Sequence, residues 1–593
     1  MRYLRMLSNS VVAAGLGSTY ILALFIQLNP SLPVNAPGFI ALIATVGLFY
    51  IVNLTVAFYL LLVLRQLLAR DLFSPAWLSV DVLSWLGALA SGAAAVLMWE
   101  NLGTFGLVVD PSTSAALQGS SVVLALCSLS CVTLAIARRR NPEARTMFGL
   151  ALVTVVAGSV VVPQALRGVH IPLVLEARAL DAQLDLASTD RAARVSLVAI
   201  DGGSLDFITG ATAEGRLPNF GKILDAGAVR HLATLRPTSA EAVWAAVATG
   251  KLPQKNGVRS AALYRLSRGQ GAIELLPEFC LARGLVRLGL LLEESQTSAA
   301  FRARPLWSIL GTHSLSAGIV GWPLTQPAPV VRGYVVSDVY HRMAAAPTAV
   351  DEPSAIYPPE LQGIATAAME RVEAEGPMVV AEGPPVVAAS LGGLQSWQET
   401  PALVDRIYDR IAQSIASARR VQVTLMRYRS LEPIGHYFLR YAMPSAFGDA
   451  RGEVSGEDLR QLAGVLERHY ALIDEALGRQ MTALGPDDLL LVVSGYGMEP
   501  MSVVKRLIER VAGDPLLNGT HDDAPDGFLM AYGGAVARGR QQARASVVDV
   551  VPTILYFLGL PVGRDMDGFA RTDLFQSSFT DERPIAFIPT YDR

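Results

Sequence analysis

One acidic residue stands where an α/β sheet would place a site residue. The run RVSLVAIDGG (194–203) is a short stretch of β-branched and apolar residues that ends in Asp201 and two glycines. Such a run is typical of a buried parallel strand, and open α/β sheets build their sites at strand ends. Asp201 is therefore a candidate site carboxylate. A turn or a helix cap is the alternative that an isolated Asp would favour.

Histidine and cysteine are scarce, which limits the metal chemistry open to this chain. There are seven His residues, so each one near a motif carries more weight. Cys127 and Cys131 lie four apart in an apolar run, and Cys280 is isolated. This is neither a disulfide framework nor a CxxC-type metal site. The cysteines are predicted to be small apolar packing residues.

The elements that must position such residues begin near residue 195. Apolar strands alternate with helical segments from there onward, which is typical of an α/β domain. The preceding stretch, 166–194, mixes charged residues with Leu and Ala at helical spacing. It is predicted to be a juxtamembrane linker, and the α/β domain is predicted to cover residues 195–593.

The N-terminal 165 residues have the composition of a transmembrane helical bundle. The whole chain is 51% hydrophobic with a mean hydropathy of +0.37, which is high for a soluble protein. A bilayer core needs roughly 17–25 apolar residues in a helix. The stretches that approach this length are 11–28, 39–64, 80–98, 121–137 and 147–162. About five membrane helices are therefore expected in residues 1–165, and no clear cleavage site marks the first as a signal peptide.

The basic residues of the loops predict an orientation. They precede the first helix and follow the second and the fourth: Arg2, Arg5, Arg65, Arg70, Arg138, Arg139, Arg140 and Arg145. The other two loops, 29–38 and 99–119, contain no Lys or Arg. Because basic loops stay in the cytoplasm, the N-terminus is predicted to be cytoplasmic. An odd number of spans then places the C-terminal domain outside, on a multi-pass protein of the cytoplasmic (inner) membrane.

A series of sequence blocks follows the Asp201 strand in a fixed order. The blocks are LPNFGKILDAGA (217–228), LRPTSAEAVWAAVATGKLPQKNGV (235–258), LWSILGTHSLSAGIVGWPLTQPAP (306–329), IYPPEL (356–361), SLEPIGHYFLRY (430–441), LLLVVSGYGMEP (489–500), GTHDDAPDGFLMAYGG (519–534) and SVVDVVPTILYFLGLP (546–561). Together they resemble the type I phosphodiesterase/nucleotide pyrophosphatase family of the alkaline phosphatase superfamily. The resemblance covers nearly all of 195–575. It implies a central, mostly parallel sheet with helices on both faces, and cap insertions near 265–300 and 340–420 that shape a substrate pocket.

The resemblance also implies two divalent metal ions, commonly zinc, and a metal-bound Ser or Thr that attacks phosphorus. The family holds one metal with an Asp, a His four residues later and a distant His. The matching positions here are Glu432, His436 and His521. Two His and one carboxylate are a zinc-competent set with an open position. Glu in place of Asp keeps the charge but lengthens the arm, and the alternative is that both histidines are ordinary polar residues.

The positions that match the second metal are mostly without ligands. The family uses the first-strand Asp, the nucleophile, and an Asp-His pair. Asp201 remains, but Gly495 and Tyr496 stand at the other two positions. Gly supplies no ligand, and a neutral Tyr phenol is a poor one at pH 7. Counted from Trp244, the nucleophile position falls on Ala240. At most one metal ion is therefore expected, and the standard two-metal mechanism is not.

Ser239, one residue before the expected nucleophile, is the candidate for a displaced nucleophile. A one-residue shift at a strand-to-helix turn points a side chain elsewhere, however. Residues 238–241 also read Thr-Ser-Ala-Glu, a capping-box pattern in which Glu241 lies three residues after Thr238. This pattern predicts that a helix starts at Thr238.

Two main functions follow from these residues. The first is a degenerate, membrane-anchored phosphodiesterase-like domain that binds a ligand or a partner protein outside the cytoplasm. The alternative is an active phosphoester hydrolase or headgroup transferase that uses one metal, with Ser239 or a metal-bound water as nucleophile. A transport role for the bundle is a third hypothesis, which the lack of Lys, Arg or Glu within the spans disfavours.

The implied cofactor is zinc or another divalent cation, or none if the site is wholly degenerate. The implied partners are the lipid bilayer, a membrane protein complex in which a five-helix anchor would take part, and a phosphoester ligand if the domain is active. The net charge of −3 gives no bulk attraction for a nucleic acid polymer.

Overall fold

The computed structural model describes residues 2–34, 37–69, 79–140, 145–167, 193–266, 272–345, 354–376, 392–447, 456–512, 514–522, 524–540 and 544–592. The chain forms two compact units. One comprises Met1–Leu175 and Arg259–Gln296, and the other comprises Glu176–Val258 and Thr297–Arg593. Most of the predicted linker, and parts of the predicted 340–420 insertion, lie outside the described residues.

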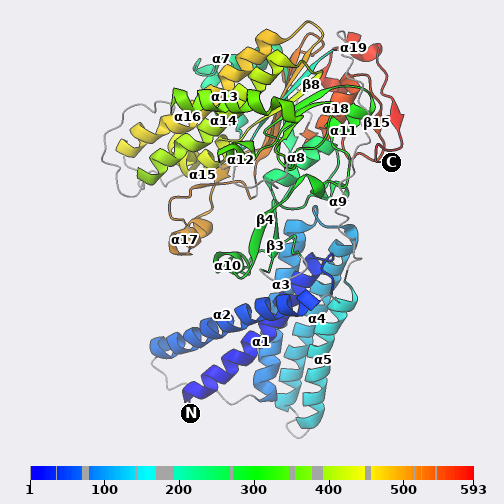
Figure 1. Ribbon diagram of the computed structural model, residues 1–593. Coiled ribbons are helices and arrows are strands. Elements are labelled where there is room, and N and C mark those ends of the chain that lie inside the picture. The colour runs from blue at the N-terminus through cyan, green and yellow to red at the C-terminus, as the bar shows by residue number, and fades with distance from the viewer. Residues whose placement is uncertain are drawn as a thin grey trace. The chain divides into compact units, whose positions relative to one another are not determined.

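Five long helices make up most of the first unit (Figure 1). They are α1 (Arg2–Leu28), α2 (Pro37–Ala69), α3 (Val80–Phe105), α4 (Pro111–Arg140) and α5 (Arg145–Ala165). Each is long and apolar enough to cross a membrane, and each contains one predicted span. The prediction of about five membrane helices is confirmed by these elements.

Buried polar side chains connect the helices of this unit. The amide nitrogen of Gln27 on α1 donates to Ser120 Oγ on α4 at 2.6 Å and to the carbonyl of Pro163 on α5 at 2.8 Å. Tyr20 Oη and Ser159 Oγ lie 2.8 Å apart. Small residues such as these serines allow membrane helices to approach closely, and polar side chains then form hydrogen bonds between the helices. The three cysteines are free and buried, as the sequence predicts.

Residues 259–296 belong to the helical unit although they interrupt the α/β domain in the sequence. They contain β3 (Ala262–Arg265), β4 (Leu292–Ser295) and the short helix α10 (Arg283–Arg287). The buried Asn29 accepts from the backbone N–H of Glu274 at 2.8 Å and donates to the carbonyl of Leu275 at 2.9 Å. Asn101 on α3 holds the backbone of Glu278 in the same two-way manner.

A buried ion pair reinforces that attachment. Arg259 Nη2 lies 2.6 Å from Asp110 Oδ2 just before α4, and its Nη1 lies 3.4 Å from Glu274 Oε2. All three side chains are at most one-tenth exposed. The cap role that the resemblance implies for residues 265–300 stays a prediction. The described part of this segment packs with the membrane helices.

The second unit is built around a large sheet. In spatial order the main path is β13 (Gly539–Arg540), β2 (Ala228–Ala233), β12 (Asp526–Gly533), β9 (Leu489–Tyr496), β1 (Val195–Ile200), β8 (Val423–Tyr428), β5 (Ala317–Val320), β6 (Gly333–Val336) and β7 (Ile356–Tyr357). A short strand, β14 (Ala545–Ser546), also pairs with β2. The central pairs β9–β1–β8–β5–β6 are all parallel, and β12 runs antiparallel to both its neighbours. The predicted mostly parallel central sheet is therefore confirmed.

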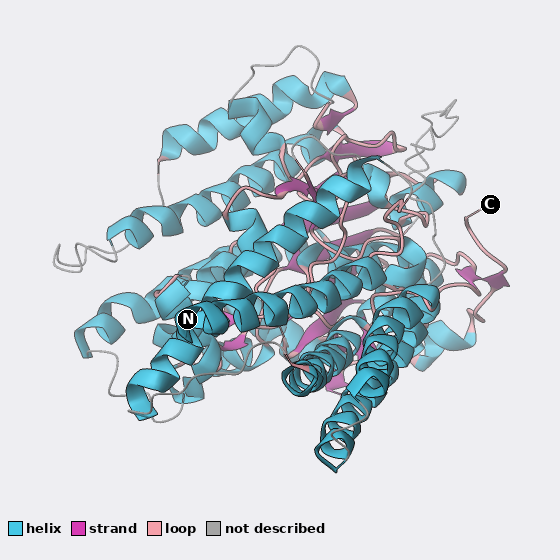
Figure 2. Cartoon of the chain, turned by 90° about the horizontal axis from the view of Figure 1, so that it is seen from below, coloured by secondary structure: helices cyan, strands magenta, loops and turns pink. Residues whose placement is uncertain are grey.

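Helices cover both faces of this sheet (Figures 1 and 2). Val195, Leu197 and Ala199 of β1 join an apolar cluster with α8, α11 and α18, whereas Val198 and Ile200 join another with α6, α7 and α13 to α16. This alternation follows from the two-residue repeat of a strand. The α-helices described in this unit are α6 (Leu205–Ala213), α7 (Pro218–Ala226), α8 (Ala240–Thr249), α9 (Pro253–Asn256), α11 (Leu306–Thr312), α12 (Tyr340–Ala345), α13 (Gln362–Glu375), α14 (Gly392–Ala418), α15 (Leu431–Ala442), α16 (Gly456–Ala483), α17 (Val503–Ala512), α18 (Val550–Phe557) and α19 (Ser577–Asp581). Two short strand pairs complete the unit: β10 (Glu499–Pro500) with β11 (Gly519–Thr520), and β15 (Val562–Gly563) with β16 (Phe587–Ile588).

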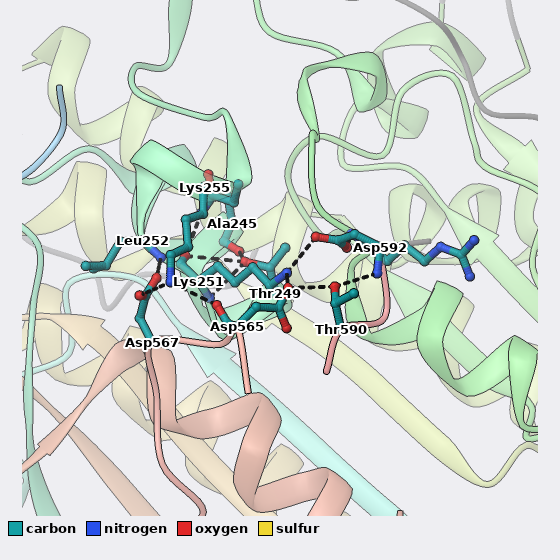
Figure 3. Close-up of polar contacts among 11 residues, drawn as sticks. Ala245, Thr249, Lys251, Leu252, Lys255, Asp565, Asp567, Thr590 and Asp592 are labelled. Atoms are coloured by element: carbon teal, nitrogen blue, oxygen red, sulfur yellow. Dashed lines mark hydrogen bonds and ion pairs between the residues drawn. The ribbon is translucent and has the colours of Figure 1, made fainter. Parts of the chain in front are cut away.

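The C-terminal end of α8 is fixed by a cluster of lysines and aspartates (Figure 3). The buried Lys251 donates through Nζ to Asp565 Oδ2 at 2.5 Å and to Asp592 Oδ2 at 2.6 Å. The more exposed Lys255 pairs with Asp567 at 2.5 Å. Since α8 begins at the expected nucleophile position, this cluster anchors the helix that borders the candidate site.

Candidate functional site

The ends of three neighbouring strands meet at one edge of the sheet. Asp201 follows β1, as the sequence predicts, and the neighbouring strand β9 ends at Tyr496. On the other side of β1, Arg427 of β8 lies opposite Ala199 in the parallel register. Parallel strands present their carboxyl ends at the same edge, which is where α/β sheets place their sites.

A glycine brings α15 close to the end of β1. Gly202 has a φ of +65°, a conformation that favours glycine, and a Cβ there would lie 3.2 Å from the Cα of Glu432. The first turn of α15 can therefore approach the Asp201 loop closely. Along α15, Glu432 and His436 are four residues apart and share one face of the helix.

His521 reaches the same place from the β10–β11 pair. It directly follows β11, and the Nδ1 atom of His436 lies 2.9 Å from the carbonyl oxygen of Gly519 in that strand. A carbonyl only accepts, so His436 carries its proton on Nδ1 and presents a lone pair on Nε2. A backbone carbonyl of this kind orients many metal-binding histidines.

The structure brings Glu432, His436 and His521 together. One ligand atom from each lies within 4.8 Å of the others, and they form the one such group of three among the described residues. His521 Nε2 lies 3.0 Å from Glu432 Oε1. Burial opposes the ionised form of Glu432, but its hydrogen bond to His521 lowers its pKa to about 2. Burial lowers the pKa of His436, whereas Glu432 outweighs burial and raises the pKa of His521.

These three residues fit a single divalent metal ion. Two imidazoles and one carboxylate are the donor set of catalytic zinc sites, in which water or substrate takes the fourth position. The longer Glu arm is compatible with this convergence, because the Glu432 carboxylate already contacts His521. All three side chains are partly buried rather than solvated.

Asp201 is engaged differently. Its Oδ1 accepts from Trp244 Nε1 at 2.6 Å and from Arg427 Nε at 3.1 Å, and its Oδ2 accepts from Arg427 Nε at 3.0 Å and Nη2 at 2.5 Å. Asp201 is fully buried. Burial raises the pKa of Asp201, and the guanidinium opposes that shift. Burial would lower the pKa of Arg427, but the pair with Asp201 raises it, so the guanidinium stays charged.

The remaining positions of the second metal do not fit an ion. A Cβ at Gly495 would lie 2.4 Å from Val243 Cγ1, so a ligand side chain could not be placed there without movement of Val243. Tyr496 is fully buried, and its hydroxyl has no hydrogen-bond partner among the described residues. Burial raises the pKa of Tyr496 well above its usual value, so the phenol is neutral and a poor ligand.

The turn before α8 differs from the sequence prediction. The helix begins at Ala240 with Ser239 as its N-cap residue, one position later than predicted. The predicted capping box is wrong, because Thr238 Oγ1 donates to the Leu235 carbonyl. Glu241 instead accepts a hydrogen bond from Ser239 Oγ at 3.2 Å. Ser239 therefore has a carboxylate partner, whereas Ala240 offers no nucleophile.

Sequence reasoning missed Arg427, and it did not predict the contacts of Trp244 with Asp201 or of Glu241 with Ser239. A signal for Arg427 was present: VTLMRY (423–428) is an apolar strand with a single charged residue one position from its end. A charge inside a buried strand requires a buried partner. The identity of that partner depends on strand pairing, which the pattern alone does not give.

Known proteins similar to this chain were found by family and by structure. The family model described as type I phosphodiesterase / nucleotide pyrophosphatase matches residues 195–553. No curated protein matches the chain in sequence. Among solved structures, murine ectonucleotide pyrophosphatase / phosphodiesterase 5 matches at 11% identity with a TM-score of 0.37, covering 65% of this chain and 100% of that chain. The human protein of the same name matches at 12% identity with a TM-score of 0.36 and the same coverage. The chain belongs to the type I phosphodiesterase/nucleotide pyrophosphatase family.

Proposed function

We propose that the α/β domain binds one divalent metal ion, with zinc as the best fit, and through it a phosphoester ligand or a partner protein, without two-metal turnover. The observation that carries this proposal is the convergence of Glu432, His436 and His521 within 4.8 Å. A zinc ion there would supply a Lewis acid for phosphoryl oxygens. The chain itself supplies the fixed tautomer of His436 and the ionised, partly buried carboxylate of Glu432.

The poor fit of the second ligand set supports a degenerate member of the family. Asp201 is already paired, Gly495 has no room for a side chain, and Ala240 has no hydroxyl. Two-metal phosphoryl transfer needs both ions to stabilise the attacking and leaving oxygens. A chain with one ion is therefore expected to bind phosphoesters more readily than it cleaves them.

We further propose that the domain lies outside the cytoplasm on an inner-membrane anchor. The distribution of basic residues among the loops of the five helices supports a cytoplasmic N-terminus. Residues 340–420 are proposed to border the pocket as a cap, as in the family. A polytopic anchor also suits membership of a membrane protein complex.

The test is the zinc content of the full chain purified in detergent, after chelation and repletion. One equivalent per chain is expected, with loss of binding in His436→Ala and in His521→Ala. The matched control is His341→Ala, which changes a partly buried histidine that contacts Tyr408 and is absent from the Glu432 group. Hydrolysis of bis(p-nitrophenyl) phosphate is expected to stay at the level of His521→Ala. A wild-type zinc content near zero would contradict the proposal.

A second candidate function is one-metal catalysis. It is favoured by the hydrogen bond from Ser239 Oγ to Glu241, a partly buried carboxylate whose pKa is raised by burial. In this scheme Ser239 Oγ forms a bond to phosphorus and passes its proton to Glu241 while the alkoxide leaves. Water then releases a phosphate monoester from Ser239 in a hydrolase, and a second alcohol takes the phosphoryl group with its remaining ester in a headgroup transferase.

Substitution of Ser239 and Glu241 distinguishes one-metal catalysis from ligand binding without turnover. Ser239→Ala and Glu241→Gln would both abolish turnover of the phosphodiester while zinc content stays at one equivalent. Turnover that is present in the wild type and lost in both variants would establish the second candidate. Turnover that survives Ser239→Ala would exclude Ser239 as nucleophile.

A further inference from the structure

The Asp201 carboxylate has no capacity left for a metal ion. A carboxylate offers about four lone-pair positions. Three nitrogen donors occupy both oxygens of Asp201: Trp244 Nε1 contacts Oδ1, Arg427 Nη2 contacts Oδ2, and Arg427 Nε is shared between the two. The residue is also closed to water, with no exposed surface. A second ion at this position would have to displace the guanidinium and the indole together.

The backbone register places Arg427 for this contact. Ala199 and Asp201 are two residues apart and point to the same side of the sheet. Arg427 lies opposite Ala199 on the adjacent strand, so its side chain emerges on that side as well. The small side chain at position 199 leaves room for the guanidinium to reach diagonally to Asp201. The pairing is therefore a product of the central β1–β8 ladder and not of a mobile surface loop.

The residues beside Asp201 also leave no place for a second metal ion. Val243 of α8 fills the space beside Gly495, and Tyr496 occupies a fully buried position. A site that had only lost ligands would leave Asp201 as an unpaired buried charge, which proteins avoid. Here the charge has a partner of opposite sign that contacts both of its oxygens.

We propose that the guanidinium of Arg427 permanently takes the place of the second metal ion as the counter-charge of Asp201, so that the pocket is built for one metal ion. The inference rests on the proposed function only for the first ion. It assigns Arg427 a positioning role: it holds Asp201 and the end of β1 in place whether or not metal is bound at Glu432, His436 and His521.

A double-mutant cycle on the full chain in detergent, with metal removed, tests the pairing. Arg427→Met and Asp201→Asn each leave one buried charge without a partner, and each is expected to lower the apparent unfolding midpoint by roughly 5–10 °C. The double variant removes both charges, so its midpoint is expected to lie well above the value given by the sum of the two decreases. Arg429→Met is the matched control, because Arg429 lies two residues along the chain and its side chain donates to the Asp338 carbonyl and not to Asp201. Its shift is expected to be under about 2 °C.

The zinc content of the same proteins provides a second measurement that does not depend on the folding of Arg427→Met. Wild type and Asp201→Asn are both expected to hold one equivalent, since Asp201 is not a ligand. Two equivalents in the wild type, or loss of one equivalent in Asp201→Asn, would overturn the inference. Strictly additive midpoint decreases would overturn it as well. A wild-type content near zero contradicts the proposed metal site instead, and the mutant cycle still decides the role of Arg427.

Discussion

His521 Nε2 lies 3.0 Å from Glu432 Oε1, and the two side chains shift each other's pKa in opposite directions. Glu432 has a pKa of about 2, and the pKa of His521 is above its ordinary value. The contact therefore favours the imidazolium form of His521 and the carboxylate form of Glu432 in the metal-free protein. A metal ion that binds His521 must first displace that proton.

Zinc affinity is accordingly expected to rise with pH. The raised pKa means that His521 keeps its proton at pH values where an ordinary histidine has lost it, and protons compete with zinc below that pKa. The dissociation constant is expected to increase by up to about tenfold for each unit that the pH falls below the pKa of His521. Zinc titrations at pH 6, 7 and 8 measure this. A constant affinity across that range would show that His521 is not a ligand.

The length of the Glu432 arm is expected to matter less than its charge. Glu432→Gln removes the charge and should weaken zinc binding by about 100-fold or more, because a ligand is lost rather than an outer partner. Glu432→Asp keeps the charge and shortens the arm, so its loss of affinity should be smaller. Competition with a chelator of known affinity measures both values. Equal losses in the two variants would mean that reach, and not charge, limits the site.

Lys251 is expected to be important for the stability of the α/β unit. It is 3% exposed and lies between Asp565 and Asp592. Lys251→Met leaves two carboxylates without their shared cation and should cost about 3–5 kcal/mol. Lys255→Met removes a half-exposed lysine paired with Asp567 and should cost less than about 1 kcal/mol. Urea unfolding followed by limited proteolysis measures both, and similar losses would contradict the importance of burial.

The contact between position 495 and Val243 predicts a second coupling. Gly495→Ala places a Cβ 2.4 Å from Val243 Cγ1 and should destabilise the fold by about 1–3 kcal/mol. Val243→Ala makes room for that methyl group. The double variant should therefore be more stable than the sum of the single losses predicts. Thermal unfolding of the three variants measures the coupling, and additive effects would show that the two positions do not compete for space.

Much of the fold was predictable because its signals are local. The apolar spans of the five helices and the β1 run that ends at Asp201 depend on residues adjacent in sequence. The blocks that carry the family resemblance also place Glu432, His436 and His521 correctly enough to predict that they meet.

The features that sequence reasoning missed depend on contacts between distant residues. Arg427 and Asp201 are 226 residues apart, and only the β1–β8 pairing brings them together. The capping box failed for a related reason, since Thr238 bonds the Leu235 carbonyl and Glu241 bonds Ser239. A short polar pattern does not specify which of several nearby partners each side chain takes.

The membership of residues 259–296 in the helical unit bears on how this protein can be handled and made. The chain passes between its two units at 175/176, at 258/259 and at 296/297, so no single cut releases the α/β unit intact. A soluble fragment starting near residue 170 would carry Leu275, Leu285 and Leu291 without the helices beside which they are buried. Such a fragment is expected to aggregate unless residues 259–296 are replaced by a short linker. During biosynthesis, residues 259–296 are made after the five helices with which they pack and before the α/β unit is complete.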